Sequence, residues 1–376
     1  MPTLDIPVSL ADHINATILK VSEDRVQGFS PDPFGEIAAL CELPAETVLE
    51  RIKALLEAGV IRRVRQTLLA TSLAQGALVA WKIAPEMLSA AFDDLFLNDP
   101  FSGHIVVRST DAETPGSVYK LWTTLKVPQG YSLRKHAEWW ANRVGAESVK
   151  LMSAKRLFTL GVGHLRRREL QIGAKSDAPG AVLDTQIVEL SDLDWTVLVA
   201  LKRELTPAEV VRNLWELRAE EAGVDFDTFC TVAQSLNSRG VVGRFSTFLE
   251  HVKETASGER VTRYNALFHW KVPVGQELQA GREVGRFECM THAYWREGGP
   301  EFADVNIMGV AHGMDKALVL ANKAAIDAHL ESVGIPVAYT NVFWGGRSEI
   351  KPSEIAPQAY LDWCESVGLA PKEMRE

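Results

Sequence analysis

Apolar positions recur along the first part of the chain every three to four residues, the spacing that places them on one face of a helix. Leu10, Ile14 and Ile18 show this pattern, and Gly59 supplies the left-handed stop that commonly ends a helix. Three short helices followed by a small β-ribbon are typical of a winged helix-turn-helix domain. The predicted elements are helices over 9–20, 34–41 and 46–58 and a strand pair from Val60 onward.

The pattern changes at Ala77, where strand-like segments begin to alternate with helical ones. Their order is β-α-β-β-α-β, which predicts a ferredoxin-like module. The segment TDAETPG, residues 110–116, joins the two middle strands and is a candidate lid. The predicted elements are strand 77–83, helix 87–97, strands 103–109 and 117–127, helix 133–145 and strand 148–162.

The whole pattern then starts again in the second half of the chain. The segment from Arg239 matches the segment from Ala58, and NALFHWKV (265–272) matches GALVAWKI (76–83). Helices are expected over 191–205, 208–222, 227–238 and 315–333, and strands over 265–272 and 336–344. We therefore predict an α+β fold, a tandem repeat of a winged helix-turn-helix plus a ferredoxin-like (βαββαβ) module. The expected domains are 1–72, 73–170, 185–255 and 256–350, with a linker over 171–184 and a C-terminal tail over 351–376 that packs on the body.

Composition is that of a globular protein. The chain has 376 residues, of which 46% are hydrophobic and 24% charged, so sizeable cores and more than one domain are expected. Four scattered cysteines without C-x-x-C spacing predict neither a thiolate zinc site nor a disulfide framework. No signal peptide and no apolar run of membrane-spanning length is recognised. A cytoplasmic protein without a membrane partner is expected.

Charge argues against DNA as a partner. The net charge is −9, and the second helix of the expected helix-turn-helix carries Glu46, Glu50 and Glu57. Such a helix is poorly suited to a phosphate-lined groove, so a role in dimerisation or as a clamp is favoured. Arg62 and Arg63 belong to a basic cluster on the expected ribbon that could meet a phosphate or a carboxylate-rich ligand.

The chemistry concentrates in a duplicated His-x-x-x-Arg motif. It occurs as His104 and Arg108 in the first half of the chain and as His292 and Arg296 in the second. Alternation along a strand puts His292, Tyr294 and Arg296 on one face. The opposite face is then expected to carry Thr291, Ala293 and Trp295. A His can move a proton near neutral pH, and an Arg pairs with carboxylates, so a site for a large anionic ligand is predicted.

Several segments, in order, resemble the sirohaem decarboxylases, Lrp/AsnC-like enzymes of the haem d1 and alternative haem pathways. In that family two subunit types pair and are fused in some members, and this chain resembles such a fusion. The resemblance implies removal of CO2 from acetate side chains of sirohaem, or a closely related iron tetrapyrrole, to give didecarboxysirohaem. No cofactor would be required, and the iron tetrapyrrole would be bound as substrate or product. The segments are GVIRRV (59–64), YKLWTTL (119–125), SAKRLFTLGV (153–162), THAYWR (291–296) and DVNIMGVAHG (304–313).

The chain also departs from the family pattern. Ala293 stands where the family has Cys, Trp295 where it has an acid, and Val305 where it has Tyr. In the first half, only His104 and Arg108 remain of the motif H-N-Y-x-R. These departures leave open which half is catalytic and whether the substrate is altered or the activity lost.

The resemblance implies roles for the candidate residues. His292 is expected to donate the proton, with His312 and His104 as further catalytic candidates, and His312 could instead be an axial ligand of the iron. The expected substrate-binding residues are Arg296, Tyr294, Asn306, Arg108, Lys120, Trp122, Arg62, Arg63, Lys155 and Arg156. A core role for Trp122 and a solvated strand edge for Lys155 and Arg156 are the alternatives.

Other functions stay open on the sequence. The twin winged helix is also typical of an Lrp/AsnC-type ligand-sensing transcription regulator, and the eroded first-half motif is compatible with a tetrapyrrole-binding protein without catalysis. The two halves are expected to form an internal pseudo-dimer. A homodimer or an association with related decarboxylase subunits would be compatible with it.

Overall fold

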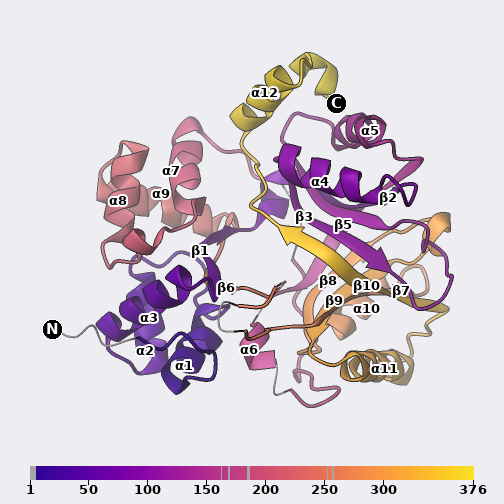
Figure 1. The fold of residues 1–376 in the computed structure, drawn as a ribbon, viewed down its shortest axis with the longest axis horizontal. Helices are drawn as coiled ribbons and strands as arrows, with labels where there is room; N and C mark the ends of the chain where they lie inside the picture. The colour runs from indigo at the N-terminus through magenta and orange to yellow at the C-terminus, as the bar shows by residue number, and fades with distance from the viewer. Residues whose placement is uncertain (1–5, 162, 168–169, 184–186, 252, 256–257) are drawn as a thin grey trace. The chain divides into compact units, whose positions relative to one another are not determined.

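The computed structural model describes residues 6–161, 163–167, 170–183, 187–251, 253–255 and 258–376, and two compact units share them (Figure 1). One unit combines Met1–Ser72, Val162–Glu169 and Val188–Arg263. The other combines Leu73–Gly161, Leu170–Ile187 and Tyr264–Glu376. Each unit therefore takes segments from both halves of the repeat.

The first unit is mainly helical. Asp12 caps α1 by accepting hydrogen bonds from the backbone N–H groups of Ile14 and Asn15, so this helix begins later than its apolar pattern suggests. Its elements are α1 (His13–Ser22), α2 (Pro33–Cys41), α3 (Ala45–Glu57), β1 (Ile61–Leu68), η1 (Ala70–Ser72), α6 (His164–Arg167), α7 (Asp192–Lys202), η2 (Pro207–Glu209), α8 (Leu214–Ala222), α9 (Phe226–Ser238) and β6 (Val242–Leu249).

Two predictions for this unit were wrong. The helix expected over 208–222 is interrupted, because η2 ends at Glu209 and α8 begins only at Leu214. The described residues do not form the strand pair expected within each half either. Each half contributes a single strand, and β1 pairs antiparallel with β6 across the repeat. After β1 the chain passes through η1 into the second unit instead of turning back, so the partner strand comes from the other half.

The second unit contains two β-α-β-β-α-β segments. The first comprises β2 (Ala74–Lys82), α4 (Leu88–Asn98), β3 (Ser102–Ser109), β4 (Leu121–Pro128), α5 (Leu133–Val144) and β5 (Ser148–Leu160). The second comprises β7 (Tyr264–Lys271), α10 (Glu277–Gly285), β8 (Met290–Arg296), η3 (Pro300–Phe302), β9 (Ile307–Gly313), α11 (Lys316–Ser332) and β10 (Tyr339–Ile350). The expected α+β class is confirmed.

The eight strands of these segments close into a barrel. Their order is β10-β3-β4-β2-β5-β8-β9-β7, and β7 pairs with β10 to complete the ring. Within each segment the second, third, first and fourth strands are neighbours in that order. The segments are joined where β5 pairs with β8 and where β10 pairs with β3. Closure leaves no free sheet edge and creates an interior lined by both halves.

Apolar residues divide the barrel into an outer and an inner layer. On the outside α4 and α5 pack against the first four strands, and α10 and α11 against the other four (Figure 1). The C-terminal helix α12 (Pro357–Ser366) joins the first of these cores through Tyr360 and Trp363 and is followed by η4 (Pro371–Met374). An inner cluster contains Trp122, Phe302 and Phe343.

The expected linker over 171–184 is attached to the barrel's helices along its described part, which ends at residue 183. Gly173 N–H donates to Asn322 Oδ1 at 3.0 Å, and Gly180 N–H donates to the Arg282 carbonyl at 2.8 Å. These contacts fasten the segment to α11 and α10, so it is a strap rather than a free connector.

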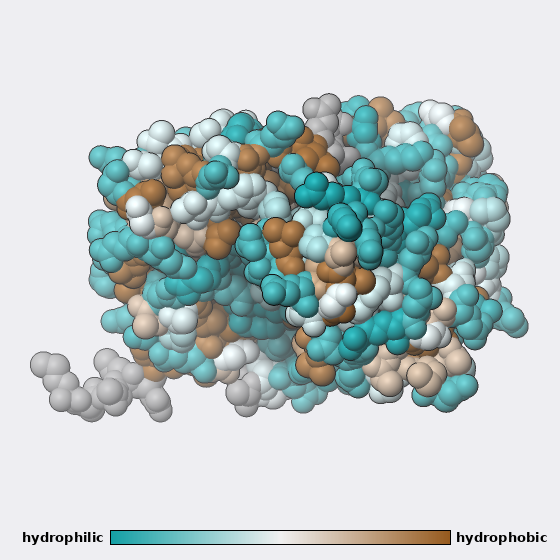
Figure 2. All heavy atoms as spheres, turned by 90° about the horizontal axis from the view of Figure 1, so that it is seen from above, coloured by the Kyte–Doolittle hydropathy of each residue, from teal (hydrophilic) through white to brown (hydrophobic). Residues whose placement is uncertain are grey.

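Exposed apolar residues are dispersed. Leu97 and Val274 are 71% and 93% exposed, and the face shown in Figure 2 has apolar residues scattered among hydrophilic ones. None of the helices in the described ranges combines the length and apolar character needed to cross a membrane.

Candidate active site inside the barrel

The polar face predicted for β8 lies on the inner side of the barrel. Ala293 packs into the outer core beneath the helices, whereas Tyr294 is paired with Met308 of the inner cluster. The His292 and Tyr294 rings are stacked, with centroids 6.0 Å apart, and the Arg296 guanidinium lies 4.4 Å from the Tyr294 ring centroid. The prediction that these three side chains share a face is confirmed.

The two arginines of the duplicated motif are anchored in the same way. Arg296 Nη1 donates to the Met152 carbonyl on β5, and Arg108 Nη1 donates to the Phe343 carbonyl on β10 at 3.2 Å. Met152 and Phe343 occupy corresponding positions, since they pair with Leu78 and Leu267 of the two first strands. Each arginine thus reaches across the joint between the halves.

Neither arginine forms an ion pair with any described residue. Arg108 is 4% exposed, and burial lowers its pKa to about 9. Its Nε is buried without a hydrogen-bond partner in the described structure. Burial also lowers the pKa of Arg296. A buried cation without a counter-charge is costly to the fold, so these groups suit an anionic ligand.

His269 is an interior residue that the sequence pattern did not assign. It is 1% exposed, and its ring lies 4.9 Å from that of Phe343 and 6.0 Å from that of Phe302. Burial and the nearby positive charge of Arg108 lower its pKa to about 3, so the imidazole is neutral. Asn265, also unassigned, accepts from Arg108 Nη1 at 3.3 Å. Period-two spacing with the inner Leu267 is the signal that could have found both residues.

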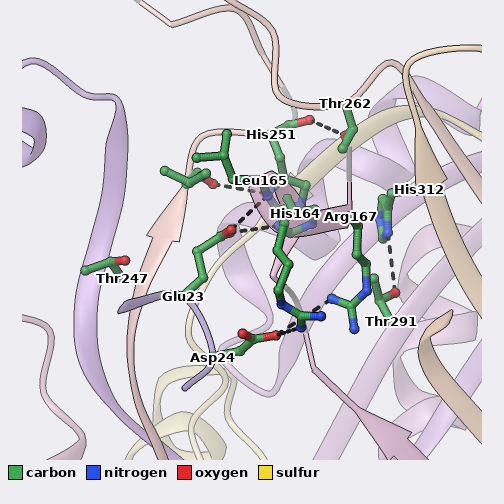
Figure 3. Close-up of polar contacts among 12 residues, drawn as sticks. Glu23, Asp24, His164, Leu165, Arg167, Thr247, His251, Thr262, Thr291 and His312 are labelled. Atoms are coloured by element: carbon green, nitrogen blue, oxygen red, sulfur yellow. Dashed lines mark hydrogen bonds and ion pairs between the residues drawn. The ribbon is translucent and has the colours of Figure 1, made fainter. Parts of the chain in front are cut away.

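Thr291 joins the site against expectation. Simple alternation puts it on the outer face, but its hydroxyl lies 3.1 Å from His292 Nδ1. The same hydroxyl lies 3.4 Å from His312 Nδ1 (Figure 3) and donates to the Val310 carbonyl at 3.0 Å. A β-bulge between Met290 and His292 breaks the alternation and explains the difference.

His104 has different contacts from His292. Its Nε2 lies 2.8 Å from Ser348 Oγ, and its backbone N–H donates to Thr124 Oγ1 at 3.0 Å. It lies on the same face of β3 as Arg108, and the Arg108 N–H donates to the Lys120 carbonyl at 2.7 Å. The half-buried Lys120 therefore adjoins the first arginine through the main chain.

Comparison with solved structures identifies a protein of the same architecture. A crystal structure of the siroheme decarboxylase NirDL matches with a TM-score of 0.64 and 16% sequence identity, over 94% of this chain and 99% of NirDL. The chain has the fold of NirDL. A structure of NirDL in co-complex with an iron-uroporphyrin III analogue matches with the same values. The E. coli AsnC structure matches at a TM-score of 0.29, with 13% identity over 42% of this chain and 92% of AsnC. Neither protein-family models nor curated protein sequences give a match.

Within this NirDL-like fold, the side chains of two predicted site residues form hydrogen bonds to the main chain. The Asn306 side chain clamps the end of β7, accepting from Val272 N–H at 2.9 Å and donating to its carbonyl at 3.0 Å. Trp122 is fully buried, and its indole N–H donates to the Tyr119 carbonyl at 2.8 Å. Both residues therefore make contacts within the scaffold, and their expected role in substrate binding stays a prediction.

The remaining predicted residues lie elsewhere. Lys155 forms a surface ion pair with Glu297, and Arg156 Nη1 donates to the Lys155 carbonyl at 2.7 Å. Arg62 and Arg63 are on β1 of the first unit, where Arg63 Nε lies 3.0 Å from Glu204 Oε1. Burial lowers the pKa of Arg62 to about 10. The substrate-binding role expected for these four residues stays a prediction.

Proposed function

We propose that this protein removes CO2 from acetate side chains of sirohaem, or of a closely related iron tetrapyrrole, to give didecarboxysirohaem. The observation that carries the proposal is a pair of arginines, the buried Arg108 and the half-buried Arg296, which have no acidic partner among the described residues. Two fixed cations, one from each half, suit a large ligand with several carboxylates. The fold of NirDL, a siroheme decarboxylase with a known iron-uroporphyrin III analogue complex, supports the same substrate class.

In the proposed reaction the bond between the acetate CH2 and its carboxylate breaks, and CO2 leaves. The electron pair of that bond stays on the carbon next to the pyrrole, which then takes up one proton and becomes a methyl group. His292 in its protonated form is the proposed donor, because an imidazole exchanges protons near neutral pH. The tetrapyrrole itself accommodates the electron pair, so no cofactor is needed for the chemistry.

Arg296 is proposed to hold a neighbouring carboxylate. It lies four residues from His292 on the same face, and the Tyr294 ring stands between the two groups, 6.0 Å from the His292 ring and 4.4 Å from the guanidinium. A macrocycle can present one side chain to His292 and another to Arg296 on the two sides of this ring. Arg108 would hold a third group from the other half. Tyr294 lies between His292 and Arg296, and burial raises its pKa, which keeps the phenol protonated as a wall of the site.

We also propose that the halves are duplicated units, each a winged helix-turn-helix plus a ferredoxin-like module, that form an internal pseudo-dimer. Support comes from the matching order of strands in the two barrel segments and from the equivalent arginine anchors. In this proposal one ligand site lies between the barrel segments of the two repeats.

The test is anaerobic incubation of the purified protein with iron-loaded sirohaem, followed by mass analysis of the tetrapyrrole. Successive losses of CO2 are expected. A bound chromophore whose mass stays unchanged would support the alternative of a binding protein without catalysis. If mixing gives no change in the visible spectrum, a tetrapyrrole is not the ligand.

A further inference from the structure

We infer that Thr291 is a positioning residue that fixes the tautomers of His292 and His312, and that Gly103, the equivalent residue of the first half, has no side chain to do the same for His104. The inference rests on the proposed function for its catalytic meaning. The positions of the ring protons on His292 and His312 can be tested without any substrate.

The position of Thr291 follows from the strand register. Met290 pairs with Ala311 and His292 pairs with Val310, so β8 advances two residues while β9 advances one. Thr291 is the extra residue of this bulge, and bulges commonly redirect a side chain. It is fully buried, and its hydroxyl reaches the neighbouring strand as well as both imidazoles.

Counting protons around the hydroxyl sets the direction of each bond. A threonine hydroxyl has one proton and two lone pairs. Its proton is donated to the Val310 carbonyl at 3.0 Å. The contacts at 3.1 Å to His292 Nδ1 and 3.4 Å to His312 Nδ1 must then be received by the lone pairs. Both neutral imidazoles therefore carry their proton on Nδ1, and each must gain or release a catalytic proton at Nε2.

The first half has an equivalent β-bulge, but the extra residue of that bulge has no hydroxyl group. Ser102 pairs with Leu125 and His104 with Thr124, so Gly103 is the extra residue there and precedes His104 as Thr291 precedes His292. A Cβ at Gly103 would lie 2.3 Å from Ser353 Oγ and 3.3 Å from the Lys351 carbonyl, so a side chain is excluded unless these residues move. In His104 the nitrogen that contacts a hydroxyl is Nε2, 2.8 Å from Ser348 Oγ, whereas in His292 it is Nδ1. Proton delivery is thereby assigned to the second half, and the first half contributes binding through Arg108.

Two variants separate the hydroxyl from the shape of the side chain. Thr291→Val keeps the branched shape and removes the hydroxyl, and Thr291→Ser keeps the hydroxyl. Thr67→Val is the matched control, because Thr67 also donates from one strand to a carbonyl on the next, that of Arg244 at 2.9 Å, but lies in the helical unit. Nitrogen-15 NMR of histidine-labelled, ligand-free protein reports which ring nitrogen carries the proton. Mass-detected turnover and visible titration with sirohaem report catalysis and binding.

The expected result is Nδ1–H at His292 and His312 in the wild type, in Thr291→Ser and in Thr67→Val. Thr291→Val should shift both rings toward Nε2–H and lower turnover about 10- to 100-fold, the usual effect of losing an orienting partner, with binding nearly unchanged. Wild-type rings protonated on Nε2, or unchanged tautomers in Thr291→Val, would overturn the inference. Absence of turnover in the wild type, with the NMR result as expected, would refute the proposed function and leave the tautomer assignment standing.

Discussion

Two arginines, the buried Arg108 and the half-buried Arg296, define the site at the scale of single residues. Arg108 and Arg296 each donate to a main-chain carbonyl across the joint between the halves, and neither forms an ion pair with a described residue. The His-x-x-x-Arg repeat was visible in the sequence, and so was the shared face of His292, Tyr294 and Arg296. Burial without a counter-charge could not be predicted, because it depends on strands far apart in the chain.

Replacing Arg108 tests whether it serves the ligand or the fold. Arg108→Met removes a buried, unpaired cation and keeps much of its volume, so we expect the melting temperature of the ligand-free protein to stay the same or to rise. Sirohaem binding should weaken by at least about tenfold, since a charge-assisted bond to a carboxylate is worth roughly 1.5–3 kcal/mol. Thermal melts and visible titrations measure the two effects. A lower melting temperature with unaffected binding would make Arg108 a structural residue.

His292 and Arg296 should show opposite kinetic defects. We expect His292→Ala to reduce turnover by about 100-fold or more while sparing most of the binding, because general acid catalysis typically contributes 10²–10⁴-fold. Arg296→Ala should weaken binding first. Single-turnover assays at saturating and limiting substrate separate the two effects. The reverse pattern would exchange the roles given to these residues.

At the scale of elements, the local sequence predicts the bounds of helices but not the pairing of strands that are far apart in the chain. The ranges expected for α2 and α3 differ from the observed ones by a single residue at the ends, because spacing and stop signals are local. The ribbon of β1 and β6 was mispredicted, because its two strands come from opposite halves of the chain. The bulge that brings Thr291 into the site was missed for the same reason, since only the register with β9 reveals it.

The hydrogen bonds that link α12 to His136 and Asp99 predict how the stability of the fold changes at acid pH. His136 contacts Asp99 Oδ1 through Nε2 at 3.3 Å and Tyr360 through Nδ1 at 3.1 Å, and all three are buried. Burial alone would raise the pKa of Asp99, but the charge and hydrogen bond of His136, with the hydrogen bonds of Ser102 and Phe101, outweigh it and lower the pKa. A lowered folded-state pKa means stability that is present above the unfolded value of about 3.9 and is lost as pH falls through the folded value.

Asp99→Asn should therefore lower the free energy of unfolding by about 3–5 kcal/mol at pH 7, the usual cost of breaking a buried pair. The difference from the wild type should shrink as the pH falls below about 3.9, because the wild-type carboxylate then loses its advantage. Urea unfolding across pH measures it. Asp93→Asn is the control, since its exposed pair with Arg347 should contribute at most about 1 kcal/mol. An equal, pH-independent loss in both variants would contradict the assignment to Asp99.

At the scale of the whole molecule, the α+β class follows from periodicity, whereas the closed barrel does not. Two ferredoxin-like patterns can be recognised one at a time, but closure depends on β5 meeting β8 and β10 meeting β3. Those pairings join segments from different halves of the chain, and no local pattern encodes them. The interior residues that closure brings together, His269 and Asn265 among them, were accordingly missed.

Net charge makes a prediction about DNA. With a charge of −9 and with Glu46, Glu50 and Glu57 on α3, the protein should show no steep salt-dependent binding to duplex DNA. Fluorescence anisotropy of labelled DNA over a range of salt concentrations measures it. Tight binding that weakens steeply with salt would favour the ligand-sensing regulator over the enzyme.

The most direct test of the decarboxylation is a reaction in deuterium oxide, with sirohaem under anaerobic conditions and mass analysis of the product. Each acetate that loses CO2 should acquire one deuteron on the new methyl group, and His292→Ala should prevent both changes. Sirohaem recovered from the wild-type reaction with all its carboxylates intact would contradict the proposed function.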